Sequence, residues 1–291
     1  MPLTHAVPPI PTPFASAEHV EGNAIQAIDL GEPTEPPDHV AFLEGIQRYA
    51  VEGRLGLIPV VRGYVAAAVL VRHDGTLRVA DEEAEEFVVV PLERLTGAQR
   101  KELESAGLPI YDCTESERSH PILDIQLAAK VVEDLRETVE RRVARRHIAV
   151  SSSEWLVVDG SISGLGESLD GRLSVLGVIK SHETQFLAGH DLEVALTLPV
   201  GHRTSVFSRS PGRRTAVYTW YLRLWPWEGQ ELLHGLVRIE RPATAESVTD
   251  ATMVSRWLMA ERAPLAAPDG RWDRLLYPIR QVETYLRAQA G

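Results

Sequence analysis

The segment at residues 155–161, WLVVDGS, constrains the fold most, because a short apolar run ends abruptly in a carboxylate, a glycine and a hydroxyl. An apolar run of this length with two valines predicts a buried strand. Aspartate is unfavourable inside a strand, and glycine lets the chain leave it in a tight turn. We therefore expect Asp159 at the carboxyl end of a strand, where open α/β sheets bind their ligands.

The same pattern occurs much earlier in the chain, in the segment HVAFLEGIQ at residues 39–47. There Glu44 and Gly45 follow the apolar run, so Glu44 is expected at a strand end as well. Two such strands would direct two carboxylates to one point. Carboxylate oxygens are the ligands that hard divalent cations prefer.

Composition places the chain in the ordinary globular class. Its 291 residues, 44% hydrophobic and 24% charged, are enough for one large domain or two small ones. The single cysteine, Cys113, excludes an intramolecular disulfide and a cysteine-rich zinc site, and it fits a cytoplasmic location. We expect no membrane segment and no secretory signal, because apolar runs are short and the N-terminus is Pro-rich.

Taken by itself, the net charge of −11 argues against a general nucleic-acid binder, because phosphate binding needs cationic surface. The charge is unevenly spread, with an acidic cluster at 81–86 and a basic one at 141–147. The only lysines are Lys101, Lys130 and Lys180, so a lysine that follows an apolar strand is noteworthy.

Residues 1–37 carry many prolines and no sustained hydrophobic period, which predicts an extended arm or a partly ordered lead-in. The hydrophobic pattern after them predicts mixed helices and strands. A long helix is expected over 121–146, and the Asp159 strand follows it. The other expected strands are 39–49, 56–62, 64–72, 77–80, 87–91, 173–179, 203–208, 214–225 and 232–240, and the other expected helices are 96–106, 190–197, 246–262 and 279–289.

This order predicts an α/β fold with a mixed sheet and a ribonuclease-H-like core: antiparallel strands, a long central helix and C-terminal helices. In that arrangement the first strand, the long helix and the following strand each supply a carboxylate. Together the carboxylates hold Mg²⁺ or Mn²⁺ for phosphodiester cleavage.

The chain resembles the NurA nucleases, which process DNA ends together with the HerA hexameric ATPase. The resemblance rests on a series of short motifs in order, spread over residues 39–289. They are the strand ending in Glu44-Gly45, a helix glutamate a little under 20 residues before the next motif, VVDGS at 157–161, VIKSH at 178–182, and the RIERP and Tyr277-Pro278 segments near the C-terminus.

The resemblance implies a nuclease domain at 38–291 that holds Mn²⁺ or Mg²⁺ through Glu44, Glu140 and Asp159. Glu140 fits the family spacing best, with Glu137 as the alternative. Lys180 would face the scissile phosphate, and Glu283 would contribute a further site group. DNA as substrate, a HerA-like hexameric ATPase as partner and a homodimer are implied in the same way.

Other interpretations of these residues stay open. Asp159 could be a turn-forming residue, Glu140 part of a solvated helix face, and Arg238 with Glu240 a structural network. Glu44 stands where the family has Asp, and its extra methylene shifts a carboxylate by about 1 Å, which can cost ~10²-fold in rate. The alternatives are therefore a non-catalytic binding subunit of the same fold, and an unrelated α+β phosphoesterase acting on a small substrate.

Overall fold

The computed structural model describes residues 17–115, 120–151, 154–182, 184–209, 216–264 and 272–290. Their contacts divide the chain into two compact units, each built from separate stretches of sequence. Unit 1 consists of the described residues of Met1–Glu35, Gly160–Gly166 and Leu176–Leu275, and unit 2 of those of Pro36–Asp159, Glu167–Val175 and Leu276–Gly291.

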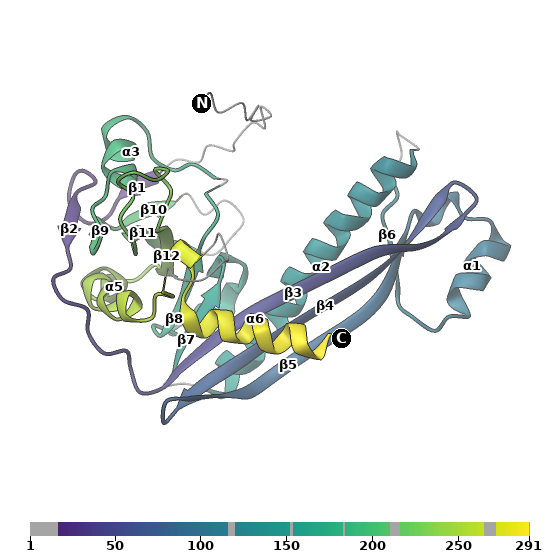
Figure 1. Ribbon diagram of the computed structural model, residues 1–291, viewed down its shortest axis with the longest axis horizontal. Helices are drawn as coiled ribbons and strands as arrows, with labels where there is room; N and C mark the ends of the chain where they lie inside the picture. Colours follow the sequence, from purple (N-terminus) through teal and green to yellow (C-terminus); the bar gives the residue numbers. More distant parts are fainter. Residues whose placement is uncertain are drawn as a thin grey trace. The chain divides into compact units, whose positions relative to one another are not determined.

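Unit 2 is built on three long antiparallel strands, β3 (Val40–Leu55), β4 (Ile58–His73) and β5 (Thr76–Val90) (Figure 1). The turn between β4 and β5 is a two-residue hairpin. Asp74 (φ 49°) and Gly75 (φ 72°) both adopt the left-handed conformation that a type I′ turn requires.

The strands are longer than the sequence pattern predicted, because Gly63 does not interrupt β4. A Cβ atom at Gly63 would lie 2.4 Å from the Phe87 ring, so this glycine makes room for an aromatic side chain of β5. The segments expected at 56–62 and 64–72 therefore form one strand, and those at 77–80 and 87–91 form another.

Two short parallel strands complete the sheet of unit 2. β7 (Trp155–Asp159) pairs with β3, and β6 (Ile110–Asp112) pairs with the last residues of β5. The strand order is β7-β3-β4-β5-β6, so the expected mixed sheet and α/β class are confirmed.

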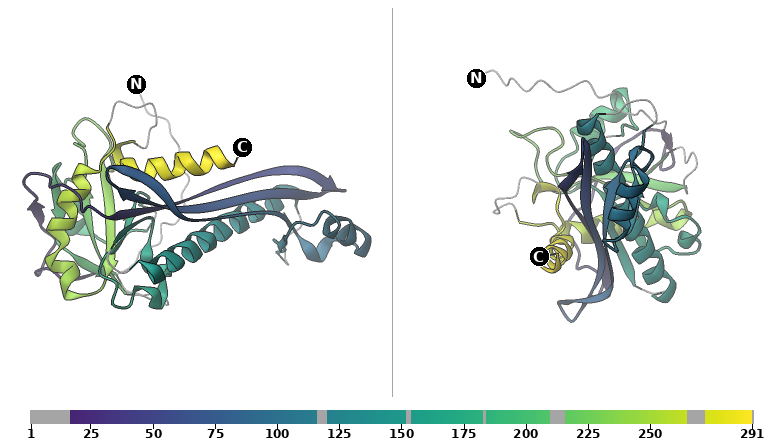
Figure 2. Two further views of the ribbon diagram at one scale, coloured as in Figure 1. Left: turned by 90° about the horizontal axis from the view of Figure 1, so that it is seen from below. Right: turned by 90° about the vertical axis from the view of Figure 1, so that its right-hand side faces the viewer.

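Helices α2 (Pro121–Val150) and α6 (Tyr277–Gln289) cover opposite faces of this sheet (Figure 2). The expected long helix is confirmed, and it buries an apolar stripe of Ala128, Val132, Val139, Val143, Ala144 and Ile148. The shorter α1 (Gly97–Glu104) begins at Thr96, which forms a capping box with Gln99.

The acidic and basic clusters noted in the sequence lie against each other in unit 2. Arg146 of α2 makes a two-pronged contact with Asp81 of β5, at 2.9 and 3.1 Å. Arg142 pairs with Glu83 at 2.5 Å and with Glu85 at 3.3 Å. These ion pairs join the exposed side of α2 to β5.

Unit 1 contains a second set of strands, β1 (Ala17–His19), β10 (Phe207–Arg209), β11 (Val217–Arg223), β12 (Leu236–Pro242) and β8 (Val175–Ile179), all antiparallel in that order. β2 (Ala27–Asp29) pairs with β9 (His202–Thr204), which pairs with β11. The helices are α3 (Gly189–Leu196), α4 (Ala245–Thr249) and α5 (Ala251–Ala260).

Short 3₁₀ helices connect these elements at Leu92–Arg94, Ile162–Gly164, Gly166–Leu169 and Trp272–Arg274. No helix in the described part of the chain is long and apolar enough to cross a membrane.

Residues 17–35 differ from the extended arm that the sequence predicted over 1–37. They form β1 and β2, and Ile25 and Leu30 are each 1% exposed. Glu21 accepts two hydrogen bonds from the buried Arg203 guanidinium, at 2.7 and 2.8 Å. Apolar residues hidden among many prolines thus belong to the core of unit 1, while residues 1–16 of the expected arm lie outside the described residues.

His182 should make unit 1 acid-sensitive. Its Nε2 lies 3.0 Å from the Leu236 carbonyl oxygen and its ring lies against Tyr221. Burial lowers the pKa of His182 to about 4, so between pH 6.5 and pH 4 the unfolded chain binds a proton that the folded chain does not. His182 therefore lowers the free energy of unfolding as the pH falls through that window, by about 2 kcal/mol at pH 5.

We expect His182→Gln, which keeps a donor for Leu236 but does not titrate, to lose less stability between pH 7 and pH 5 than the parent. Urea unfolding at both pH values measures the difference. Equal losses in the two proteins would contradict a buried neutral His182.

Candidate functional site

Asp159 is the last residue of β7, as predicted. β7 runs parallel to β3, and the final registered pair of the two strands is Leu43 with Val158. Glu44 and Asp159 each follow that pair directly, and neighbouring parallel strands lie about 4.8 Å apart. The expectation that these two carboxylates occupy adjacent positions is therefore consistent with the register.

Glu44 is not at a strand end, which corrects the sequence interpretation. It is the fifth residue of the 16-residue strand β3, and the backbone continues extended through Gly45. What ends at this level is the parallel partner, β7. The acid-glycine pair of β3 therefore marks the point where its neighbour stops, and the Gly45 amide lies 3.3 Å from Glu44 Oε1.

Gly45 makes room for the carboxylate of Glu140. A Cβ atom added at Gly45 would lie 2.1 Å from Glu140 Oε1 and 2.6 Å from its Cγ, too close for any side chain. Glu140 comes from α2, and only 12% of its side chain is exposed. The helix glutamate predicted from the motif spacing is thus held against β3 at Gly45, the residue after Glu44.

The carboxylates approach β3 from two faces. Gln47 accepts a hydrogen bond from Arg136 of α2 at 3.0 Å, so Gly45, two residues earlier, also faces α2. Arg48 donates to the carbonyl oxygens of Arg287 and Ala290, so Glu44 lies on the face that α6 covers. By register, Asp159 shares the face of Glu44.

Glu140 is the most perturbed acid of this group. Burial raises the pKa of its carboxyl to about 7, and the negative charges of Asp159 and Glu137 add to the rise. The ion pair with Arg136 acts in the opposite direction but does not cancel it. A carboxyl in this setting gains free energy from any additional cation close to it.

Arg136 was not among the residues expected from the sequence. It lies one helical turn before Glu140, and the Arg-x-x-x-Glu spacing was a signal that could have revealed it. Glu137, the alternative helix ligand, is 45% exposed and pairs with Arg141 at 3.2 Å on the surface. Of the two helix glutamates, Glu140 is therefore the one that faces β3.

Glu283 lies on α6 with 7% of its side chain exposed, so it is not a surface residue. Its carboxylate is held between Arg280 and Arg287 of the same helix, at 2.9 and 3.0 Å. These two arginines balance its charge within α6.

Lys180 directly follows β8 and belongs to unit 1, whereas the four carboxylates belong to unit 2. Its carbonyl oxygen accepts a hydrogen bond from Arg274 at 3.1 Å. The role expected for its ammonium group stays a prediction.

The chemistry of the acidic residues fits a hard divalent cation, because Glu44, Glu140 and Asp159 offer carboxylate oxygens, one of them on a buried acid. Within the described ranges, however, no three His, Cys, Asp or Glu side chains are arranged around a common point as metal ligands. In this structure the Arg136 guanidinium pairs with the Glu140 carboxylate.

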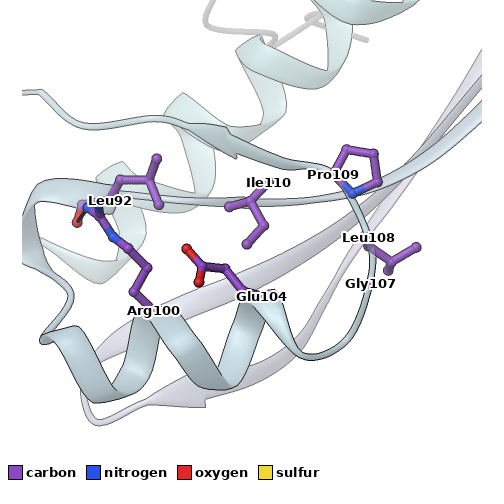
Figure 3. A pocket seen from close by; sticks show the side chains of 7 residues that line it. All are labelled: Leu92, Arg100, Glu104, Gly107, Leu108, Pro109 and Ile110. Atoms are coloured by element: carbon purple, nitrogen blue, oxygen red, sulfur yellow. Dashed lines mark hydrogen bonds between the residues drawn. The ribbon is translucent and has the colours of Figure 1, made fainter.

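A pocket of about 540 Å³ in unit 2 contains none of the predicted site residues (Figure 3). It is lined by Leu92, Arg100, Glu104, Gly107, Leu108, Pro109 and Ile110. Arg100 donates to the Leu92 carbonyl oxygen at 3.0 Å, and Glu104 brings a negative charge to the same wall. The single arginine of this lining is offset by an acid, so the pocket gives the phosphoesterase alternative no specific support.

We expect Gly45→Ala to displace the Glu140 carboxylate, because the new methyl group occupies its space. The displaced acid loses its burial, so its pKa falls toward the ordinary value. The free energy of unfolding changes by no more than about 3 kcal/mol. Gly53→Ala, in the same strand, is the matched control, since a Cβ atom at Gly53 would meet nothing within 4 Å. Carbon-13 NMR titration of the glutamates and urea unfolding measure both effects; an unchanged Glu140 titration in Gly45→Ala would contradict this packing.

No protein-family model matches the sequence, and no curated protein matches it either. Among solved structures, the chain is similar to the NurA nuclease from Sulfolobus solfataricus, with a TM-score of 0.54 at 10% sequence identity over 89% of this chain and 81% of that one. The catalytic domain of human endonuclease V aligns over 87% of this chain and 82% of its own with 14% identity, at a TM-score of 0.34. The chain therefore has the fold of the NurA nuclease, as the sequence motifs predicted.

Proposed function

We propose that this protein is a divalent-metal-dependent DNA nuclease that hydrolyses phosphodiester bonds at DNA ends. One observation carries the proposal: Glu140 packs into the space left by Gly45, the residue after Glu44, at the level of β3 where β7 ends in Asp159. The fold shared with the NurA nuclease supports the same function.

Glu44, Glu140 and Asp159 are the groups that would hold Mn²⁺ or Mg²⁺. The cation would supply Lewis acidity toward the phosphodiester and the attacking water. The protein contributes the placement of the acids: the β3–β7 register aligns Glu44 with Asp159, and Gly45 admits Glu140.

Arg136 neutralises Glu140 in this structure, so a divalent cation would compete with a guanidinium for that carboxylate. Glu283 would act from α6, the helix over the face of β3 that carries Glu44, and Lys180 would stabilise charge on the phosphate. Lys180→Met tests the second role, and unchanged cleavage would remove Lys180 from the mechanism.

A HerA-like hexameric ATPase would explain how a chain with a net charge of −11 acts on DNA. The motor would supply much of the DNA affinity, because a net-negative nuclease neutralises few phosphates by itself. We extend the proposal to a homodimer working with such an ATPase.

A non-catalytic DNA-binding or assembly subunit of the same fold is the second candidate. Two observations favour it: Glu44 stands in place of Asp, and Glu140 is paired with Arg136. Calorimetry with Mn²⁺ separates the two candidates, since only the nuclease should bind the ion, and labelled single- and double-stranded DNA with Mn²⁺ or EDTA then tests cleavage.

Substitution of the acids gives the sharpest test of the nuclease. Asp159→Asn should lower Mn²⁺-dependent cleavage by roughly 10²–10³-fold while the melting temperature stays equal or rises, because one of several repelling carboxylates is removed. Glu44→Asp should keep or raise activity, whereas Glu44→Gln should abolish it. Cleavage rates and thermal melts are measured on the same preparations.

The matched pair on α2 is Glu140→Gln and Glu137→Gln, one buried against β3 and one on the surface. Only the first should lose activity. The reverse result would transfer the ligand role to Glu137, and full activity in Asp159→Asn would make Asp159 a turn residue.

The ATPase partnership predicts that a purified HerA-like ATPase binds the chain and stimulates its DNA degradation. Deleting residues 1–16 removes the Pro-rich start but spares β1, so it tests docking by this segment without cutting into unit 1. We expect weaker binding with basal cleavage intact. Equal binding would exclude residues 1–16 as the docking element, and no binding by the full chain would exclude the partnership.

A further inference from the structure

The turn that follows Asp159 is anchored by a fully buried carboxylate that the proposed chemistry does not use. Glu240 lies on β12 and is 0% exposed. Its Oε2 accepts hydrogen bonds from Ser161 Oγ at 2.7 Å and from the Ile162 amide at 3.2 Å. The turn and Glu240 both belong to unit 1.

The other carboxylate oxygen is held by arginines. Arg238 Nη1 donates to Oε1 at 2.7 Å, and Arg209 Nε lies 3.6 Å from the same atom. Burial opposes the charge on Glu240, but Arg238, Arg209 and Ser161 outweigh it and lower the pKa of its carboxyl. Glu240 is therefore a permanent, well-fixed anion at neutral pH.

Two further contacts fix the same turn against β8. The Gly160 amide donates to the Val178 carbonyl oxygen at 2.9 Å. A Cβ atom at Gly177 would lie 2.4 Å from the Gly160 carbonyl oxygen, so this glycine lets the turn pack directly on the strand. Gly160 has φ 119°, a conformation that other residues rarely adopt.

We propose that Glu240 is a positioning residue: by holding Ser161 and Ile162 it fixes the main chain at the point where it leaves Asp159. The inference rests on the proposed function, because the main chain after Asp159 has to be held in place only if the Asp159 carboxylate binds a cation. Groups that orient metal ligands without touching the metal typically contribute 10–100-fold to metal affinity.

The test uses three variants of the full chain. Ser161→Ala removes the hydroxyl that Glu240 binds, and Ser161→Thr restores a hydroxyl. Ser255→Ala is the matched control, because it removes another hydroxyl of unit 1, one that is fully buried and accepts from Trp220 Nε1 at 2.9 Å. Mn²⁺ affinity by calorimetry, amide exchange at Gly160–Ile162 and urea unfolding are measured for each.

We expect Ser161→Ala to bind Mn²⁺ about tenfold more weakly and to exchange faster at Ile162, with Ser161→Thr restoring both. Ser255→Ala should lose stability without a change in Mn²⁺ affinity. Parental affinity in Ser161→Ala would overturn the positioning role alone. A parent protein that binds no Mn²⁺ would instead overturn the proposed function and this inference with it.

Discussion

The close approach of α2 to β3 at Gly45 determines where the buried charged groups of α2 lie. Because no side chain occupies that position, Glu140 reaches the strand. Arg136, one helical turn before Glu140, binds both Glu140 and Gln47. A larger residue would exclude the acid from the strand. The same device recurs at Gly63, where the missing side chain admits Phe87. Gly45 and Gly63, although inside long strands, thus serve packing and not turns.

Two buried carboxylates show how the neighbouring charges set the pKa of a buried acid. Glu240 has two arginines and a serine around it, and its pKa is lowered although it is fully buried. Glu140 has one arginine and two nearby acids, and its pKa rises to about 7. The first is a satisfied structural anion, whereas the second still gains from a further positive charge.

The sequence predicted the fold better than the arrangement of the site. Alternation and helical periodicity are local signals, so the meander, the long helix and the position of Asp159 at a strand end could be read directly. Gly45 and Gly63 were misread as strand boundaries, because a glycine that admits a side chain from a distant segment has the same local pattern as one that ends a strand. The partners of Glu140 and Glu240 depend largely on how the elements pack. Two local signs existed: the spacing of Arg136 from Glu140, and the alternation of Arg238 with Glu240 along one strand, whose interpretation as a structural network is confirmed. The burial of Ile25 and Leu30 was likewise hidden by the prolines around them.

The acidic strand β5 has a consequence for association between copies of the chain. Among the described strands only β4 and β6 pair with it, and β6 does so at Val88–Val90, so a long stretch of its outer edge has no strand beside it. Open edges of this length commonly recruit an identical edge and start aggregation. Here the stretch carries Asp81, Glu82, Glu83, Glu85 and Glu86, and two copies placed edge to edge would set these acids against their equivalents. Arg142 and Arg146 offset part of this charge within one copy, but the run of acids still disfavours pairing of β5 with the β5 of another copy.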